Sequence, residues 1–142
     1  MKEPASTTHF LNVDLELTAP FDLQPLADAF MPKMSALYLG RRGRSYFATL
    51  ELNIYRRNWN PDLAIREQHK CITALPLSAR RLWKKATTRD FSIGIVRLVR
   101  RWLSARRTVK AAAKVGARIS IVVYQPEEFR QKLRDVRVKS DK

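Results

Sequence analysis

The sequence predicts an α+β fold, in which a single, mostly antiparallel sheet of about five strands carries helices packed on one face. Four segments alternate apolar and polar residues with the period of two that half-buried strands show, and others place apolar residues three or four positions apart, as helices do. The expected order is strand, helix, strand, strand, two helices, strand, helix, strand. With 142 residues, 45% of them apolar, the chain can bury the core of one domain. We therefore expect a single domain over residues 1–142, with flexible ends at 1–8 and 137–142.

The first strand and the first helix are separated by a proline. Residues 11–17 alternate between leucine or valine and polar side chains, which predicts a strand that Pro20 ends. Apolar residues on one side of 23–31 predict a short helix, and Asp22 is the expected cap.

A tight turn joins the second and third predicted strands. Residues 36–39 form the first of these strands, and residues 46–55, which alternate cleanly, form the second. Gly40-Arg41-Arg42-Gly43 is the expected turn between them, because glycine accepts the backbone angles of tight turns.

The middle of the chain predicts two helices separated by Pro76. Asn60 as cap and Pro61 at the first position indicate a helix that runs to about Leu75. Ser78 is the expected cap of the second helix. The apolar stripe of that helix consists of Ala79, Leu82, Trp83 and Ala86, and its opposite side carries Arg80, Arg81, Lys84 and Lys85.

The last third predicts two strands with a basic helix between them. Residues 91–95 and 118–124 alternate as strands, and a helix is expected within 97–115, most clearly over 108–115, with Gly116 as its stop. At about 100° per residue, its apolar half consists of Leu98, Val99, Trp102, Leu103, Val109 and Ala113. Its basic half consists of Arg97, Arg100, Arg101, Arg107 and Lys114. A short last helix is expected within 127–135.

The face of the sheet away from the helices is predicted to be polar. The alternation of the strands places these side chains on it: Asn12, Asp14, Glu16, Thr49, Glu51, Asn53, Ser92 and Ser120. We expect this face to be in contact with water or with something polar.

The charge of the chain is strongly positive and unevenly distributed. The formal net charge is +15, with 28 Lys and Arg against 13 Asp and Glu. Residues 1–40 have a net charge of −3, so residues 41–142 have a net charge of +18. From Phe91 to Pro126 there are eight basic residues and no acidic one. Such a field favours anionic partners but does not identify a reaction.

No group of residues predicts catalysis or a metal site. Asp14, Glu16 and Glu51 fall on the polar side of strands, where solvation keeps the pKa of a carboxyl from rising as general acid catalysis requires. His69 and Cys71 are two positions apart on a predicted helix and point about 200° from each other, so they cannot act as a dyad. We expect no catalytic residue, no metal ligands and no cofactor.

The sequence also favours a cytoplasmic protein without a membrane span. Cys71 is the only cysteine, so a disulfide framework within one chain is excluded. Residues 1–14 lack the apolar core of a signal peptide, and no stretch approaches the roughly 20 apolar residues of a membrane span.

The basic helices are the candidate binding surface. Their arginines could contact the phosphates of nucleic acid without reading its sequence: Arg80, Arg81, Arg97, Arg100, Arg101 and Arg107. Trp83 and Trp102 lie close by in sequence, but both belong to predicted apolar faces, so packing explains them more simply than base stacking. A solvated basic face without a ligand is the alternative.

An RNA-binding role for the sheet face is rejected. The order of elements is similar to that of RNA-recognition motifs, and residues 42–47, Arg-Gly-Arg-Ser-Tyr-Phe, loosely resemble the signature of their third strand. However, Arg44 and Thr49 stand where that signature has aromatic residues, and the carboxylates of this face repel phosphate.

Two segments carry a resemblance to a known family. Thr88-Arg89-Asp90-Phe91-Ser92-Ile93-Gly94-Ile95 is followed by residues 108–124, TVKAAAKVGARISIVVY, and together they read as a strand, a helix and a final strand that ends in Tyr. This pattern resembles the C-terminal half of certain small bacterial proteins of unknown function, some of which are similar to immunity proteins of toxin systems. The resemblance implies a protein partner and no catalytic residues. Where that family has a strand after Ile95, this chain has the basic segment 96–107, so either a basic helix replaces the strand or the reading frame shifts locally.

The sequence therefore favours a non-catalytic interaction domain, of an immunity or accessory kind, that binds a protein partner with an acidic surface. Sequence-independent nucleic-acid binding through the basic helices is the alternative. A hydrolase that uses the acidic sheet face ranks below both.

Overall fold

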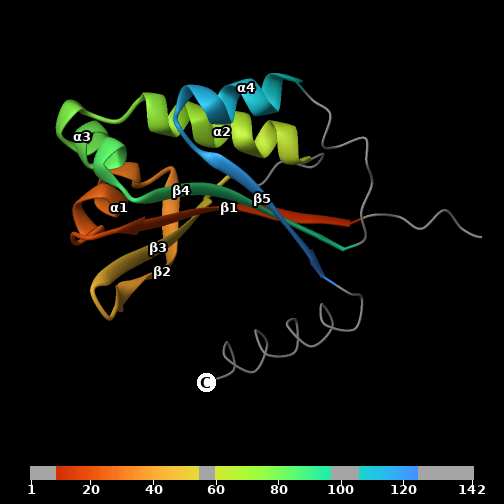
Figure 1. Cartoon of the computed structure of the whole chain (residues 1–142). Helices are drawn as coiled ribbons and strands as arrows, with labels where there is room; N and C mark the ends of the chain where they lie inside the picture. Colours follow the sequence, from red (N-terminus) through yellow and green to blue (C-terminus); the bar gives the residue numbers. More distant parts are fainter. Residues whose placement is uncertain (1–8, 55–59, 97–105, 125–142) are drawn as a thin grey trace, which may run out of the picture.

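A computed structural model of the chain describes residues 9–54, 60–96 and 106–124. Within these ranges, five strands form one sheet in the order β2-β3-β1-β4-β5, and the helices lie on one side of it (Figure 1). The pairs β2–β3, β3–β1 and β1–β4 are antiparallel, and β4–β5 is parallel. The predicted fold class, α+β with a mostly antiparallel sheet, is confirmed.

The first strand lies at the centre of the sheet and ends where the sequence predicts. β1 spans His9–Ala19 and is followed directly by Pro20. α1 spans Gln24–Phe30 with Leu23 at the cap position. The predicted cap, Asp22, sits one residue earlier, and its carboxylate accepts a hydrogen bond of 2.9 Å from the backbone N–H of Gln24.

The turn between β2 and β3 is shorter than the sequence predicts. β2 spans Met34–Arg42 and β3 spans Ser45–Leu52, so that Arg42 and Ser45 are register partners across a two-residue turn. Gly43, with φ of 60°, provides the left-handed conformation that such a turn requires. The predicted turn at 40–43 is therefore wrong in its first half, because pairing with β3 extends β2 to Arg42.

The third strand also ends earlier than predicted. Asn53 leaves the sheet because its backbone N–H donates to the carbonyl of Lys33 at 2.9 Å and its side-chain amide donates to the carbonyl of Pro32 at 2.7 Å. β3 therefore stops at Leu52 instead of continuing to Tyr55.

The two middle helices confirm one predicted cap and correct the other. α2 spans Pro61–Thr73, and the side chain of Asn60 accepts a hydrogen bond from the backbone N–H of Leu63 at 2.9 Å. α3 spans Leu77–Lys85 and begins after Pro76, so Ser78 lies inside the first turn instead of at the cap. The carbonyl of Pro76 already accepts from the N–H of Arg80, which makes Leu77 the first helical residue.

The last third gives two strands connected by a helix. β4 spans Thr88–Val96, α4 spans Arg106–Lys114 and β5 spans Arg118–Tyr124. Gly116, at φ of 67°, follows the helix and is its stop, as predicted. Residues 97–105, which hold the first half of the predicted basic helix, lie outside the described residues, as do the predicted helix at 127–135 and the two predicted flexible ends.

The buried side of α4 differs from the prediction. Thr108 and Ala112 are buried, whereas Val109 is 55% exposed and Ala113 is exposed. The helix turns this way because it packs against α2, where the hydroxyl of Thr108 donates to the carboxylate of Asp62. The prediction also takes its apolar side from residues 98–103, which precede α4, and in the structure Ala112 packs into the core on the same side as Thr108.

The core lies between the sheet and the helices. β1, β3 and β4 contribute Leu15, Leu17, Leu50, Phe91 and Ile93, each at most 2% exposed. Leu26, Phe30, Ile65, Ile72 and Trp83 meet them from the helical side. Burial of each such side chain stabilises the fold by about 1.5–3 kcal/mol, which is enough to hold α1, α2 and α3 against the sheet.

The opposite face of the sheet, here called the outer face, is polar. Asn12, Asp14, Glu16, Thr49, Glu51 and Ser120 are at least partly exposed there, as predicted. Asn53, which is also predicted on this face, is exposed but lies beyond the end of β3. Ser92 differs, because it is only 8% exposed, and its neighbour Asp90 is only 9% exposed. None of the helices within the described ranges is long and apolar enough to cross a membrane.

Candidate functional site

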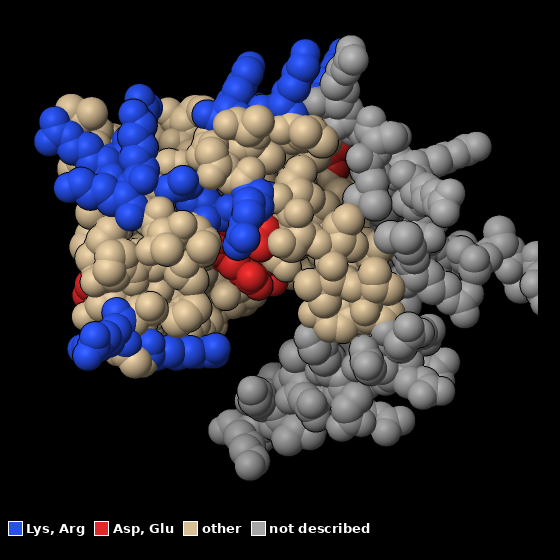
Figure 2. Space-filling view, in the orientation of Figure 1, with Lys and Arg blue, Asp and Glu red and all other residues tan. Residues whose placement is uncertain are grey.

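The exposed cations of α3 and α4 form the candidate site. Neither helix contains an acidic residue. Seven of their basic residues are exposed, and we call this set the basic surface: Arg80, Arg81, Lys84, Lys85, Arg107, Lys110 and Lys114. Lys and Arg side chains gather over this helical side of the molecule in Figure 2.

The basic surface is not neutralised by carboxylates of the described residues. The ion pairs found among them, Arg66–Asp62 and Lys70–Glu67, each 3.1 Å long, both lie within α2. On the helical side, the carboxylates of Asp62 and Glu67 pair with Arg66 and Lys70 of α2 and form no ion pair with the basic surface among the described residues. The carboxylate of Glu16 lies on the other face of the sheet. The positive charge is therefore available to an external anion.

The structure brings together only some of the predicted binding residues. Arg80 and Arg81 are neighbours on α3, whereas Arg107 begins the exposed side of α4, at the end remote from α3. Arg97, Arg100 and Arg101 lie outside the described residues. Arg80 is also partly engaged, because its Nη2 donates to the carbonyls of Thr73 at 2.7 Å and Leu75 at 3.3 Å.

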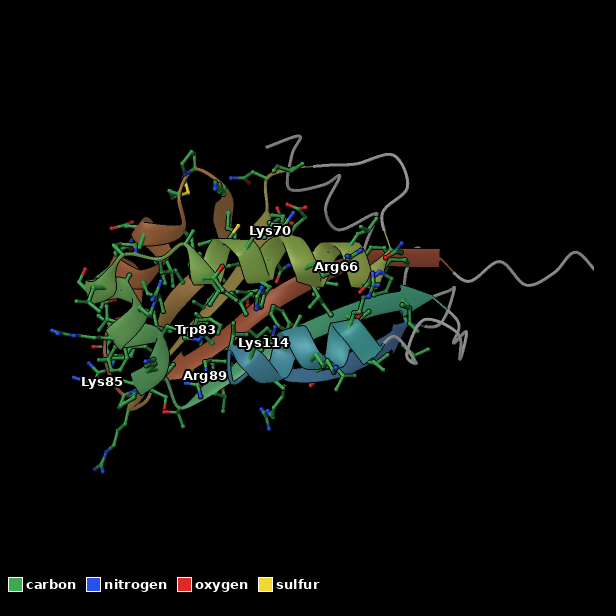
Figure 3. All side chains as sticks on the ribbon, turned by 90° about the horizontal axis from the view of Figure 1, so that it is seen from above. Arg66, Lys70, Trp83, Lys85, Arg89 and Lys114 are labelled. Atoms are coloured by element: carbon green, nitrogen blue, oxygen red, sulfur yellow. The ribbon has the colours of Figure 1, made fainter. Side chains whose placement is uncertain are left out.

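A pocket of about 530 Å³ lies where the C-terminal ends of α2, α3 and α4 meet. Seen from above, Trp83, Arg89 and Lys114 surround this place, while Lys85 points outward from the far side of α3 (Figure 3). We call it the helix-end pocket, and it is lined by Ile72, Thr73, Arg80, Trp83, Lys84, Arg89, Ala113, Lys114, Val115 and Gly116.

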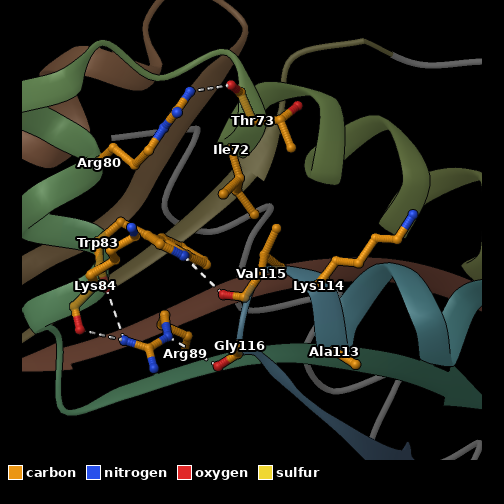
Figure 4. Close-up of a pocket in the computed structure, with 10 residues that line it drawn as sticks. All are labelled: Ile72, Thr73, Arg80, Trp83, Lys84, Arg89, Ala113, Lys114, Val115 and Gly116. Carbon is orange, nitrogen blue, oxygen red and sulfur yellow. Dashed lines mark hydrogen bonds between the residues drawn. The ribbon is translucent and has the colours of Figure 1, made fainter.

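Trp83 forms a wall of the pocket and is held in place by packing. It is only 3% exposed, and its ring lies edge-on to Phe30 at 6.4 Å between ring centroids. Its indole Nε1 donates to the carbonyl of Val115 at 2.9 Å (Figure 4). The guanidinium of Arg89 lies over its ring at 5.9 Å from the centroid. These contacts agree with the prediction that Trp83 is a packing residue.

Arg89 is the residue that sequence reasoning missed. From β4, its Nη1 donates to the carbonyls of Trp83, Lys84 and Ala86 at 2.9–3.2 Å, and its Nε donates to the carbonyl of Gly116 at 3.0 Å. These carbonyls end α3 and follow α4, where the last carbonyls of a helix have no partner within it. One guanidinium thus supplies donors for the end of α3 and ties it to the turn that follows α4. A basic residue inside a strand gives no sequence signal for such a role.

The titratable groups of α2 show no reactive pair. Burial, followed by the nearby charge of Lys114, lowers the pKa of His69. Burial raises the pKa of the Cys71 thiol, which keeps it protonated and unreactive. In the part of the chain that the structure describes, no three His, Cys, Asp or Glu side chains are grouped so that they could hold a metal ion.

The outer face contains one perturbed carboxyl that the sequence analysis does not predict. Glu16 is the register partner of Asp90 on β4, and partial burial, followed by the charge of Asp90, raises the pKa of Glu16. Asp90 itself accepts a hydrogen bond from the hydroxyl of Ser120 at 2.6 Å through Oδ2. Its Oδ1 is buried without a hydrogen-bond partner among the described residues. The face is therefore less uniformly solvated than its sequence pattern suggests.

Comparison with protein-family models, curated proteins and solved structures finds no match to this chain. Function is therefore inferred from the chemistry of the basic surface and the helix-end pocket.

Proposed function

We propose that this chain is a non-catalytic binding domain that holds nucleic acid by its phosphates through the basic surface of α3 and α4. The observation that carries the proposal is a group of seven exposed cations with no carboxylate partner among the described residues. Each phosphate that such cations neutralise releases condensed counterions, which is the main source of sequence-independent affinity.

The arrangement of cations on α3 supports contacts to several phosphates at once. Arg80 with Lys84 and Arg81 with Lys85 form two rows of residues four positions apart, so their Cβ atoms are about 5–6 Å apart along each row. The one aromatic ring of α3, that of Trp83, is buried. Without an exposed ring on this helix for base stacking, binding is expected to depend on phosphates and to tolerate any base sequence.

The test is binding of a labelled 20-nucleotide strand and a 20-base-pair duplex, measured by fluorescence anisotropy at increasing salt. If about four phosphates of the duplex are contacted, the association constant falls roughly 100-fold between 50 and 200 mM salt. Arg81→Glu is expected to weaken binding roughly tenfold, or about 1.4 kcal/mol, because it removes a cation of the basic surface and adds a repelling charge.

Arg44→Glu is the matched control. Arg44 is an exposed arginine in the β2–β3 turn that makes no hydrogen bond, ion pair or ring contact among the described residues, and the same is true of Arg81. Both variants change the net charge equally. No binding at 50 mM salt would overturn the proposal, and so would an equal loss in the two variants, since that result would show dependence on net charge and not on the basic surface.

A protein partner, of the immunity or accessory kind, is a second candidate, and the exposed apolar residues of β5 favour it. Ile121, Val122 and Val123 are 36–44% exposed, and β5 pairs with β4 alone among the described strands. Exposed apolar side chains beside an edge strand are common at interfaces. For either candidate we propose a cytoplasmic location, supported by the single cysteine.

The two candidates respond differently to the same variants. A protein complex is expected to survive 200 mM salt with fixed stoichiometry when it is reconstituted from purified components and measured by light scattering. Val123→Glu is expected to abolish that complex, while Arg81→Glu leaves it intact. Loss with Arg81→Glu alone would contradict an interface on β5.

A further inference from the structure

We propose that the helix-end pocket binds a phosphate monoester attached to a flat apolar group, the unit that a free mononucleotide or the phosphorylated end of a strand presents. The strand-end form rests on the proposed function, whereas the free-nucleotide form does not.

The pocket has a suitable size for such a ligand, and it combines an apolar part with cationic side chains. Its volume of about 530 Å³ lies within the range of about 300–1,000 Å³ typical of small-molecule sites. Ile72, Trp83 and Val115 form its apolar part, and the side chains of Arg80, Arg89 and Lys114 stand around them (Figure 4). A flat ring can therefore pack against apolar side chains while its phosphate meets cations at the edge.

The electrostatic balance of the pocket is positive even after the helix ends are counted. Three helices point their C-terminal ends at this place, and each end is equivalent to a charge of about −0.5, or roughly −1.5 in total. Four cations and no carboxylate line the pocket. The cations exceed the helix ends by about 2.5 charges, so an anion is favoured there.

The four cations divide into two kinds. Arg80 and Arg89 donate to the carbonyls of the helix ends, so they offset the helix dipoles. Lys84 and Lys114 are exposed and form no ion pair among the described residues, which leaves their ammonium groups for the ligand. In Figure 4 the side chain of Lys114 starts beside Val115 and extends toward α2, so its ammonium must turn back toward Trp83 to meet a bound phosphate.

The charge of the ligand favours a monoester over the internal phosphates of a strand. A phosphate monoester carries about −1.5 to −2 at pH 7, since its second pKa is about 6. An internal phosphodiester carries a single negative charge. The lysines of the pocket therefore gain more from a terminal phosphate than from a phosphate within the strand.

The experiment uses two pairs of probes with the full chain. Adenosine 5′-monophosphate is compared with adenosine by calorimetry, and a 12-nucleotide strand with a 5′-phosphate is compared with the same strand bearing a 5′-hydroxyl by anisotropy. We expect the monophosphate to bind at least about tenfold more tightly than adenosine. We expect the 5′-phosphate to tighten strand binding by about threefold or more.

Two matched pairs of variants on α4 locate the effect. Lys114→Gln removes a cation of the pocket, and Lys110→Gln removes another exposed lysine, four residues earlier, that does not line it. Ala113→Phe fills the pocket without changing charge, and Val109→Phe adds the same ring at an exposed position outside it. Lys114→Gln and Ala113→Phe are expected to remove the preference for the monoester, whereas their controls keep it.

Each outcome separates this inference from the proposed function. The inference fails and the proposed function stands if strands bind, but the 5′-phosphate strand binds no more tightly than the 5′-hydroxyl strand and adenosine 5′-monophosphate binds no more tightly than adenosine. If the monophosphate binds and strands do not, the site is confirmed for a free nucleotide and the proposed function fails. Equal effects of each variant and its control would place any monoester binding elsewhere and overturn the inference. Thermal unfolding followed by circular dichroism is the check that all four variants are folded.

Discussion

On the helical side of the sheet cations meet backbone carbonyls, whereas on the outer face carboxylates meet each other. Arg89 donates to four carbonyls at the ends of α3 and α4. Across the sheet, Glu16 and Asp90 are direct register partners on β1 and β4, and the pKa of Glu16 is raised. In the first region the cation stabilises the helix end, whereas in the second burial and the charge of Asp90 disfavour the ionised form of Glu16.

This difference shows that net charge is a poor measure of a binding surface. Arg80 and Arg89 serve largely to complete the helix ends, although they contribute to the formal charge of +15 as much as Lys84 or Lys114 does. The cations without such contacts, such as Lys84 and Lys114, are more available to a ligand than Arg80 and Arg89 are. The structure thus narrows a strongly basic chain to a small set of residues on two helices.

The largest effect is expected for Arg89→Met, which tests how much the guanidinium of Arg89 contributes to the stability of the helical side. Methionine keeps the apolar stem and removes the donors to four carbonyls, so the free energy of unfolding is expected to fall by about 2–3 kcal/mol. Urea denaturation measures this loss. The control, Arg81→Met, changes an exposed arginine without described contacts and is expected to stay within about 0.5 kcal/mol of the parent. Similar values for the two variants would remove the structural role assigned to Arg89.

An intermediate effect of opposite sign is expected for Glu16→Gln on the outer face. The substitution removes a carboxylate that faces Asp90, so the protein becomes more stable at pH 7, by less than about 1 kcal/mol because Glu16 is exposed enough for solvent to screen the repulsion. The raised pKa of Glu16 means that the folded state favours its protonated form. The gain is therefore present above the folded pKa and disappears as acid protonates Glu16. Denaturation curves at pH 7 and in acid check both points, and destabilisation at pH 7 would contradict the like-charge contact.

The smallest effect is expected for the pKa of His69, which responds to the charge of Lys114 at the helix-end pocket. The pKa of His69 is lowered by burial and then by Lys114, so Lys114→Gln is expected to raise it while leaving it below its ordinary value. Because the folded pKa lies below the unfolded one, stability falls as pH drops through the unfolded pKa toward the folded one. This acid-induced loss is expected to be smaller in Lys114→Gln. An NMR titration of the imidazole measures the shift, with Lys110→Gln as the control.

Periodicity predicts the elements of this chain better than it predicts their contacts. The alternation of β1 and the Asn60 cap of α2 are local signals, and the structure confirms both. The buried side of α4 carries Thr108, which donates to Asp62 of α2, and Ala112, which packs into the core, and such contacts between distant segments leave no signal in the local apolar pattern.

The candidate site could be predicted only in part for the same reason. The cations of α3 stand out because they lie on one side of a short amphipathic helix. The sequence gives no sign of the pocket, because the pocket forms only where three helix ends meet near Arg89, a residue of β4. Convergence of this kind comes from the packing of distant elements and leaves no pattern of spacing in the sequence.

The strand order has a consequence for how the chain folds during synthesis. β1 is made first but occupies the middle of the sheet, and its second partner, β4, begins only at Thr88. While residues 20–87 emerge from the ribosome, at least one edge of β1 keeps its backbone N–H and C=O groups without their native partners. The nascent chain therefore has a long interval of vulnerability to aggregation, which ends only when β4 is released from the exit tunnel and closes the centre of the sheet.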